Sequence, residues 1–137
     1  IVILFLGFGC VHCVEQLTAF GPAYDTFADR GIDIVAVGTD TPEILEAGVS
    51  EDGGHAYPFP LAADPELGLF RSWRAYDDFE EAPLHGTYLV DGEGRIRWLD
   101  ISFEPFMDWE FLLDESVRLL GLPEPTPYHS RADIDPR

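Results

Sequence analysis

Apolar residues near the start of the chain form two kinds of pattern, continuous short runs and runs with helical spacing. Residues 1–6 (IVILFL) and 32–38 (IDIVAVG) are largely apolar and end at or beside a glycine, which is typical of strands buried on both faces of a sheet. Between them, large side chains recur every three or four positions, as Leu17, Phe20, Tyr24 and Phe27. This spacing predicts a helix over residues 11 to about 29, with Gly31 as its stop.

The next stretch carries signals for two further helices and a short strand. Thr41 is a good cap, Pro42 suits the first helical position, and Glu43 favours the positive end of a helix. The segment YPFPLAAD predicts a short third strand bounded by prolines. DPELGLFRSW then predicts a third helix, with Asp64 as its cap and Pro65 at its start.

The last third of the chain carries a hairpin signal and a final helix. LHGTYLVD and RIRWLDIS lie on either side of the turn-forming residues 91–94 (DGEG), which predicts two antiparallel strands. Residues from about 108 to 120 place apolar side chains on one helical face and reach Gly121, a typical stop. Those side chains are Trp109, Leu112, Leu113, Val117 and Leu120.

The predicted order of elements is β-α-β-α-β-α-β-β-α, which indicates the α/β class. We expect a central mixed sheet flanked by helices, closed by an antiparallel hairpin and a C-terminal helix. Residues 1–121 are expected to form one domain, and the proline-rich residues 122–137 a C-terminal tail. The chain starts at Ile1 inside an apolar run rather than at Met, so we expect that a part upstream is missing.

Composition and charge narrow the possible partners. With 137 residues, 46% of them hydrophobic, the chain is long enough for one compact core. Its eight basic residues, all Arg, face 26 acidic residues, for a formal net charge of −18. Such a chain lacks the cations that nucleic acid or an anionic membrane surface requires. The apolar run at its start is also too short to cross a bilayer, so neither nucleic acid nor membrane insertion is expected.

The two cysteines of the chain, Cys10 and Cys13, lie where binding and catalytic residues of α/β sheets are commonly found. Cys10 follows the first strand and opens the predicted helix, and ligands collect beyond the carboxyl ends of strands. Backbone N–H groups at a helix start lower the pKa of a thiol there. Cys13 lies one turn further on, close enough for a disulfide. His12 stands between them; as a cation it would stabilise the thiolate, and otherwise it is a solvent-facing helix residue.

Other interpretations of the cysteine pair remain open. Structural zinc usually has four ligands, and the remaining histidines, His55, His85 and His129, form no second ligand cluster in the sequence. Two inert cysteines buried in a core are also common. The position between a strand and a helix, after two glycines, favours a redox-active dithiol over both.

Four stretches together resemble the redoxins of the alkyl hydroperoxide reductase/thiol-specific antioxidant family, the peroxiredoxin-like side of the thioredoxin-like superfamily. They are FLGFGCVHCVEQLTAF, GIDIVAVGTDTPE, FPLAADPELGLFRSW and GTYLVDGEGRIRW. In order and spacing they cover residues 1 to about 120. The resemblance implies a thioredoxin-like fold, from which the first hairpin or strand of the family is missing upstream.

The resemblance also implies two possible assignments for the cysteines. In the dithiol branch, the first cysteine of C-x-x-C, here Cys10, attacks a partner disulfide and Cys13 resolves the mixed disulfide. In the peroxiredoxin branch the motif is T-x-x-C, which places the peroxide-attacking role on Cys13 and leaves Cys10 to resolve its sulfenic acid. Either cycle uses a thioredoxin- or glutathione-type thiol as reductant and a disulfide or hydroperoxide as substrate, with no bound cofactor.

Departures from the family patterns single out further residues. Gly9 stands where thioredoxins usually carry Trp. His85 occupies the place of the thioredoxin cis-proline and of the peroxiredoxin Arg, and it is therefore a candidate hydrogen-bond donor or cation facing the sulfurs. Glu15 and Gln16 are expected on the polar face of the helix, where a carboxylate could also carry the proton of Cys13.

A function of another class is also open. The chain could be a non-catalytic thioredoxin-like module of a larger protein, used for binding or as a redox sensor, with its disulfide as a staple. An enzyme would turn over repeatedly, whereas such a module would react with one equivalent and stop.

Overall fold

The computed structural model describes residues 1–50, 54 and 56–123, which form seven strands and four helices. The elements are β1 (Val2–Phe5), α1 (Val11–Ala28), β2 (Val35–Gly38), α2 (Pro42–Val49), β3 (Leu61–Ala63), α3 (Gly68–Ser72), β4 (Tyr76–Asp77), β5 (Ala82–Pro83), β6 (His85–Val90), β7 (Ile96–Ser102) and α4 (Trp109–Leu120). Most of the predicted proline-rich tail, residues 124–137, lies outside the described residues.

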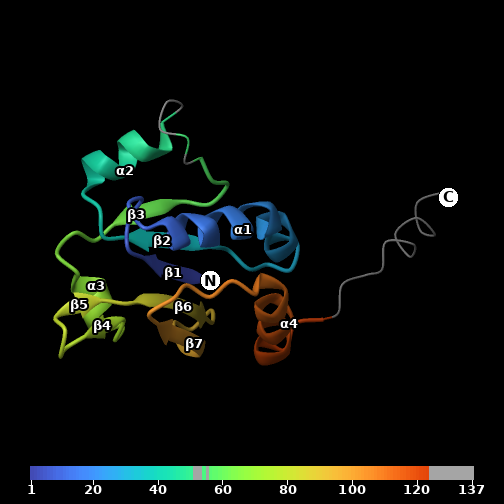
Figure 1. The fold of residues 1–137 in the computed structure, drawn as a ribbon. Coiled ribbons are helices and arrows are strands. Elements are labelled where there is room, and N and C mark those ends of the chain that lie inside the picture. Colours follow the sequence, from blue (N-terminus) through green and yellow to red (C-terminus); the bar gives the residue numbers. More distant parts are fainter. Residues whose placement is uncertain (51–53, 55, 124–137) are drawn as a thin grey trace.

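The main sheet has five strands in the order β3-β2-β1-β6-β7, so that β1 lies at its centre (Figure 1). β1 runs parallel to β2, with Val2 opposite Val35, and antiparallel to β6, with Val2 opposite Tyr88. β6 and β7 form the predicted antiparallel hairpin, in which His85 lies opposite Ser102. The sheet is therefore mixed, as the sequence predicts.

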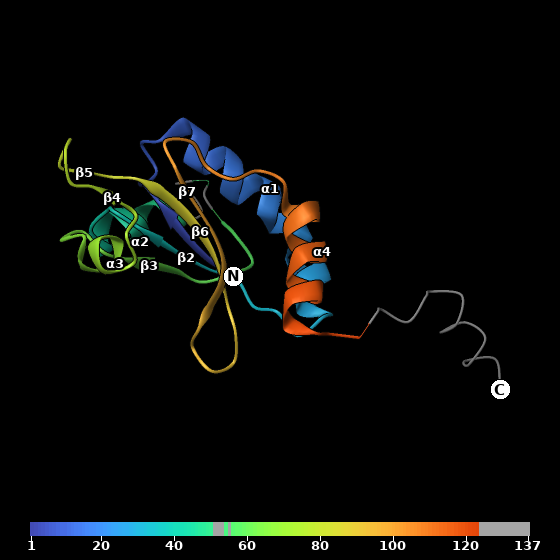
Figure 2. The same ribbon diagram turned by 90° about the horizontal axis from the view of Figure 1, so that it is seen from below.

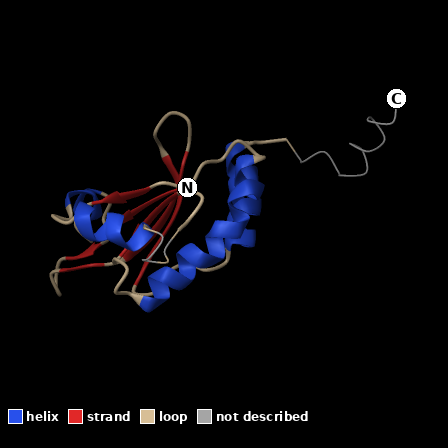
Figure 3. Cartoon of the chain, turned by 90° about the horizontal axis from the view of Figure 1, so that it is seen from above, coloured by secondary structure: helices blue, strands red, loops and turns tan. Residues whose placement is uncertain are grey.

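Alternating residues of β1 face two separate parts of the core. Ile3 and Phe5 belong to the larger apolar cluster, which contains side chains of α1 and α4. Leu4 points to the opposite face and packs in a smaller cluster with Phe70 of α3 and Tyr88. Figure 2 shows α1 and α4 together on one side of the sheet, and Figure 3 shows helices on both sides of the strands. No helix of the described part of the chain has the length and apolar character that crossing a membrane requires.

The helix ends follow the predicted capping chemistry at most positions. The Thr41 hydroxyl accepts the N–H of Ile44 at 3.3 Å, with Pro42 at the start of α2. Asp108 accepts the N–H of Phe111 at 3.0 Å to begin α4, and Gly121 ends that helix with a φ of +65°, a conformation that suits glycine.

Two local predictions are wrong or incomplete. The third helix starts at Gly68 instead of at Pro65, because Leu67 adopts a left-handed conformation with a φ of +63°. Asp64 still serves this helix, since its carboxylate accepts the N–H groups of Gly68, Leu69 and Phe70 at 2.9–3.3 Å. The β4–β5 hairpin has no counterpart in the sequence prediction.

Candidate active site

Two cysteines and a histidine that is distant from them in the sequence meet beyond the end of β1. Cys10 and Cys13 are joined by a disulfide across the first turn of α1, with their Cα atoms 5.3 Å apart. His85, the first residue of β6, brings its Nε2 to 3.1 Å from the Cys13 sulfur and 3.6 Å from the Cys10 sulfur. The sheet produces this meeting because β6 runs antiparallel beside β1.

The loop that presents the cysteines is held by Asp40, which follows β2. Its carboxylate accepts the N–H of Phe8 at 2.9 Å. Gly7 lies against the same carboxylate with a φ of +93°, and a Cβ there would come within 2.7 Å of an Asp40 oxygen. Glycine at this position is therefore required both by backbone conformation and by space. The N–H of Cys10 then bonds the Gly7 carbonyl at 3.2 Å, which places Cys10 at the start of α1.

The two sulfurs have different surroundings. The Cys13 side chain is fully buried, and its sulfur accepts the N–H of Leu6 at 3.3 Å. Cys10 is half-buried and caps α1, with its sulfur accepting the N–H of Cys13 at 3.3 Å. Each sulfur thus receives a backbone N–H at the positive end of a long helix, an environment that favours a thiolate over a thiol once the bond is reduced.

His85 is almost completely enclosed, with 7% of its surface exposed. Burial lowers its pKa below the ordinary value, and the nearby backbone of Ser102 and Phe103 opposes this shift only in part. The imidazole is therefore neutral at pH 7 while the disulfide is intact. Nδ1 is buried and makes no hydrogen bond of normal geometry within the described residues. Nε2 is the ring nitrogen that faces the two sulfurs.

Gln16 connects the cysteine helix to the histidine strand. Its side-chain amide donates to the Thr87 hydroxyl at 2.9 Å and to the Phe106 carbonyl at 3.0 Å. With 1% of its surface exposed, Gln16 does not lie on the polar face of α1, where the sequence placed it. The spacing offers one signal that sequence reasoning did not use: Gln16 follows Cys13 by three positions, so the two share the inward face of the helix.

His12 and Glu15 do lie on the outer face of α1. The His12 imidazole is 3.4 Å from the Glu15 carboxylate, and both side chains are more than half exposed. The structure places neither of them against the sulfurs. A role for His12 as a cation that favours the thiolate remains a prediction.

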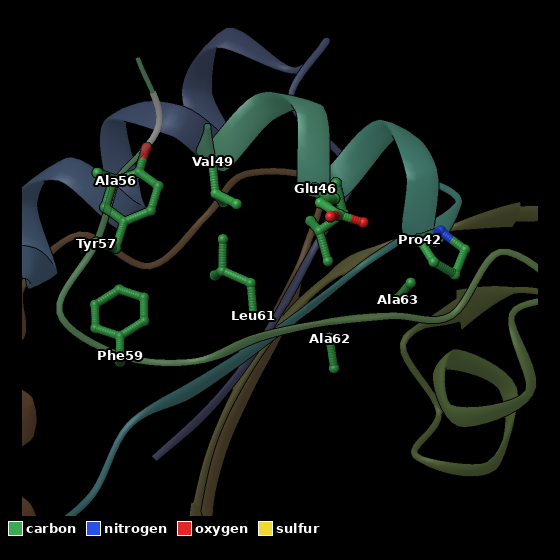
Figure 4. A pocket seen from close by; sticks show the side chains of 10 residues that line it. Pro42, Glu46, Val49, Ala56, Tyr57, Phe59, Leu61, Ala62 and Ala63 are labelled. Atoms are coloured by element: carbon green, nitrogen blue, oxygen red, sulfur yellow. The ribbon is translucent and has the colours of Figure 1, made fainter. Parts of the chain in front are cut away.

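A cavity of about 590 Å³ lies elsewhere, between α2 and β3. Figure 4 shows Pro42, Glu46 and Val49 on the helix side of this cavity, with Phe59 and Leu61 below them. Its lining, within the described residues, includes no cysteine and no histidine. Among the described residues, the cysteines and His85 therefore lie together at the sulfur pair and not in this cavity.

Comparison with known proteins shows the family of the chain. The AhpC/TSA family model matches residues 1–99, which include both cysteines and His85. The chain belongs to the AhpC/TSA family. The predicted family membership is thereby confirmed.

Similarity to individual AhpC/TSA relatives is moderate. The chain is 30% identical over 91 residues to Peroxiredoxin 2 of Sulfuracidifex metallicus, which covers 64% of the chain and 42% of that protein. It is 28% identical over 90 residues to the putative peroxiredoxin YkuU of Bacillus subtilis, covering 63% and 50%. The chain spans about half the length of the curated relatives it matches.

Solved AhpC/TSA-type structures share the fold. Mycobacterium tuberculosis AhpC superposes with a TM-score of 0.70 at 18% identity, over 86% of this chain and 70% of that one. A reduced Plasmodium vivax 2-Cys peroxiredoxin gives a TM-score of 0.68 at 18% identity, over 86% and 76%. The thioredoxin-like α/β fold predicted from the sequence is confirmed.

Proposed function

We propose that the chain is a thiol peroxidase that reduces a hydroperoxide by cycling Cys10 and Cys13 between dithiol and disulfide. The observation that carries this proposal is the environment of the Cys13 sulfur. It receives the Leu6 N–H, lies 3.1 Å from His85 Nε2 and is already bonded to Cys10. Membership of a family whose relatives are named peroxiredoxins supports the same chemistry.

In the proposed cycle, His85 takes the thiol proton of Cys13 through Nε2. The thiolate attacks the outer oxygen of the peroxide, the O–O bond breaks, and Cys13 becomes a sulfenic acid. The alkoxide that leaves takes the proton from His85 and departs as an alcohol. The Cys10 thiol then attacks the sulfenic acid, which forms the disulfide and releases water. One external dithiol of the thioredoxin type, or two monothiols of the glutathione type, return two electrons and two protons.

The assignment of Cys13 as the attacking sulfur rests on two independent supports. The T-x-x-C motif of peroxiredoxins aligns its cysteine with Cys13. The Cys13 sulfur is also the one nearer to His85, at 3.1 Å against 3.6 Å for Cys10. Cys10 stands in the place of the motif threonine and is the resolving group.

A second candidate function is exchange with a protein disulfide, and the exposure of the two sulfurs favours it. Cys10 is half-buried while Cys13 is fully buried, so a bulky partner would meet Cys10 first. The mixed disulfide would then be resolved by Cys13. We further propose that residues 1–121 act as one redoxin domain, for which sulfur is the redox element and no bound cofactor is needed.

Single-cysteine variants distinguish these possibilities. We expect the Cys10→Ser variant to form a sulfenic acid on Cys13 with one equivalent of peroxide, trapped by dimedone and located by mass spectrometry. The Cys13→Ser variant should form none. Steady-state peroxide consumption with a thiol reductant should need both cysteines. Ser116→Ala, which changes a buried residue of α4, serves as the control variant.

The opposite outcomes have defined meanings. A mixed disulfide that accumulates on Cys10 in the Cys13→Ser variant, together with insulin reduction by the wild type, assigns disulfide exchange instead. If the wild type consumes only one equivalent of peroxide or disulfide although reductant is in excess, the chain is a binding or sensing module. That result rejects the proposal that it is an enzyme.

A further inference from the structure

The sulfur pair and His85 form a cluster of three soft metal donors. The sulfurs of Cys10 and Cys13 and the Nε2 of His85 all lie within 4.8 Å of one another, and within the described part of the chain no fourth such donor joins the group. Cys13 and His85 are buried, so the cluster is largely shielded from water. In the sequence the histidine stands apart from the cysteines by more than seventy positions, and only the pairing of β1 with β6 unites them.

The softness of these donor atoms and their number decide which metal ions the cluster can bind. Thiolates favour Cu(I), Zn(II) and iron–sulfur clusters over harder ions. Structural zinc is almost always four-coordinate, whereas the d¹⁰ ion Cu(I) readily accepts three ligands. Metal–sulfur bonds of about 2.3 Å would separate the two sulfurs by about 4 Å in a trigonal site, a spacing that two reduced cysteines one helical turn apart can adopt.

We propose that the reduced chain binds one Cu(I) ion in a trigonal site formed by the sulfurs of Cys10 and Cys13 and the Nε2 of His85. This inference goes beyond the peroxidase function and does not depend on it. It requires the reduced dithiol and the histidine, but no turnover.

The surroundings of the donors suit this ion. Nε2 of His85 lies 3.1 Å from one sulfur and 3.6 Å from the other, so its lone pair would face the metal, with the ring proton on the buried Nδ1. Two thiolates and one Cu(I) leave a single negative charge. The N–H groups of Leu6 and Cys13, which point at the two sulfurs, and the positive end of α1 offset that charge.

Binding and oxidation exclude one another in this arrangement. Two thiols lose their protons and bond to the ion, which stays Cu(I), so two protons are released and no electron moves. The disulfide form has no thiolate and cannot replace these bonds. The same two sulfurs therefore either hold the ion or form the disulfide.

The test is a competition for Cu(I). The full chain is reduced and desalted without oxygen, then titrated against the coloured Cu(I)–bicinchoninate complex. We expect the wild type to remove one equivalent, and the oxidised chain to remove none. Cys10→Ser, Cys13→Ser and His85→Ala should each weaken binding by about tenfold or more, since loss of a merely supporting group already costs that much in metal sites. Thr18→Ala, at an exposed position of α1, should bind as the wild type does.

X-ray absorption on the loaded wild type gives a measurement that needs no variant. Two sulfur and one nitrogen neighbours are expected around copper. Two sulfurs alone, a second equivalent bound with equal affinity, or tighter retention of Zn(II) than of Cu(I) would each overturn the proposal. Peroxide turnover is measured separately in metal-free buffer. A chain that binds Cu(I) without turning over rejects only the peroxidase, and a chain that turns over without binding Cu(I) rejects only this site.

Discussion

The buried hydrogen bond between Gln16 and Thr87 gives the sharpest test of how the site is held. Replacing Thr87 by Val keeps the shape of the side chain and removes the oxygen that accepts the Gln16 amide at 2.9 Å. Both residues are 1% exposed, so water cannot take the place of the lost acceptor. Gln16 would keep its second bond, to the Phe106 carbonyl.

The expected loss follows from the cost of stranding a buried donor. A typical hydrogen bond contributes about 1 kcal/mol, and an unsatisfied buried polar group costs about 1–3 kcal/mol. We therefore expect Thr87→Val to lower the free energy of unfolding by about 1–3 kcal/mol. For a domain of this size, each kcal/mol lowers Tm by roughly 3–5 °C. The measurement is urea and thermal unfolding of the oxidised protein, followed by circular dichroism.

Ser116 supplies the matched control. It is fully buried in α4, and its hydroxyl has no hydrogen-bond partner among the described residues. Removing it as Ser116→Ala strands nothing and gains helix propensity, so the variant should be as stable as the wild type or more stable. If Thr87→Val and Ser116→Ala changed the free energy of unfolding by the same amount, the loss of a buried hydroxyl would cost the same with or without a hydrogen-bond partner. That result would refute the reasoning.

Three further predictions concern the frame of the site. Gly86→Ala should lower the free energy of unfolding, measured by urea titration, by about 1–3 kcal/mol, because its Cβ would lie 2.6 Å from the buried Tyr88 ring. Gly92→Ala, with open space around it, is the control and should stay within about 0.5 kcal/mol of the wild type. Asp64→Ala should lower the free energy of unfolding by about 1 kcal/mol, because three N–H groups of α3 lose their acceptor. Thermal unfolding measures this, and an unchanged Tm would show that α3 forms without the Asp64 carboxylate. Burial lowers the pKa of His85, so below about pH 6.5 the unfolded chain binds more protons than the folded chain. The free energy of unfolding of the wild type should therefore fall relative to that of His85→Asn as the pH falls from 7.5 to 5. A difference between the two free energies that stays constant over that range would show that His85 titrates alike in both states.

The sequence was sufficient for the frame of the fold, because that frame depends on local signals. The apolar run of β1, the turn residues 91–94, the cap Thr41 and the stop Gly121 each act on their immediate neighbours, and all appear as predicted. The start of α3 was missed because Leu67 takes a left-handed conformation that its residue type does not favour.

The candidate site was predictable only where its residues are adjacent. The position of Cys10 and Cys13 at a helix start follows from the order strand, glycine, helix. The approach of His85 depends on which strands are neighbours, and the sequence offered it only through resemblance to a family. The burial of Gln16 could not be read from its polarity, because its partners Thr87 and Phe106 lie 71 and 90 positions away.

The position of β1 and β6 in the middle of the five-stranded sheet decides when the site can come apart. Outer strands and termini fray in brief local excursions, whereas central strands separate only when the whole domain melts. Because the cysteines follow one of these strands through a short loop and the imidazole belongs to the other, their mutual distance is protected by the most persistent contacts of the molecule. The site is therefore expected to survive partial opening of the sheet edges and to disappear in a single step with the fold itself.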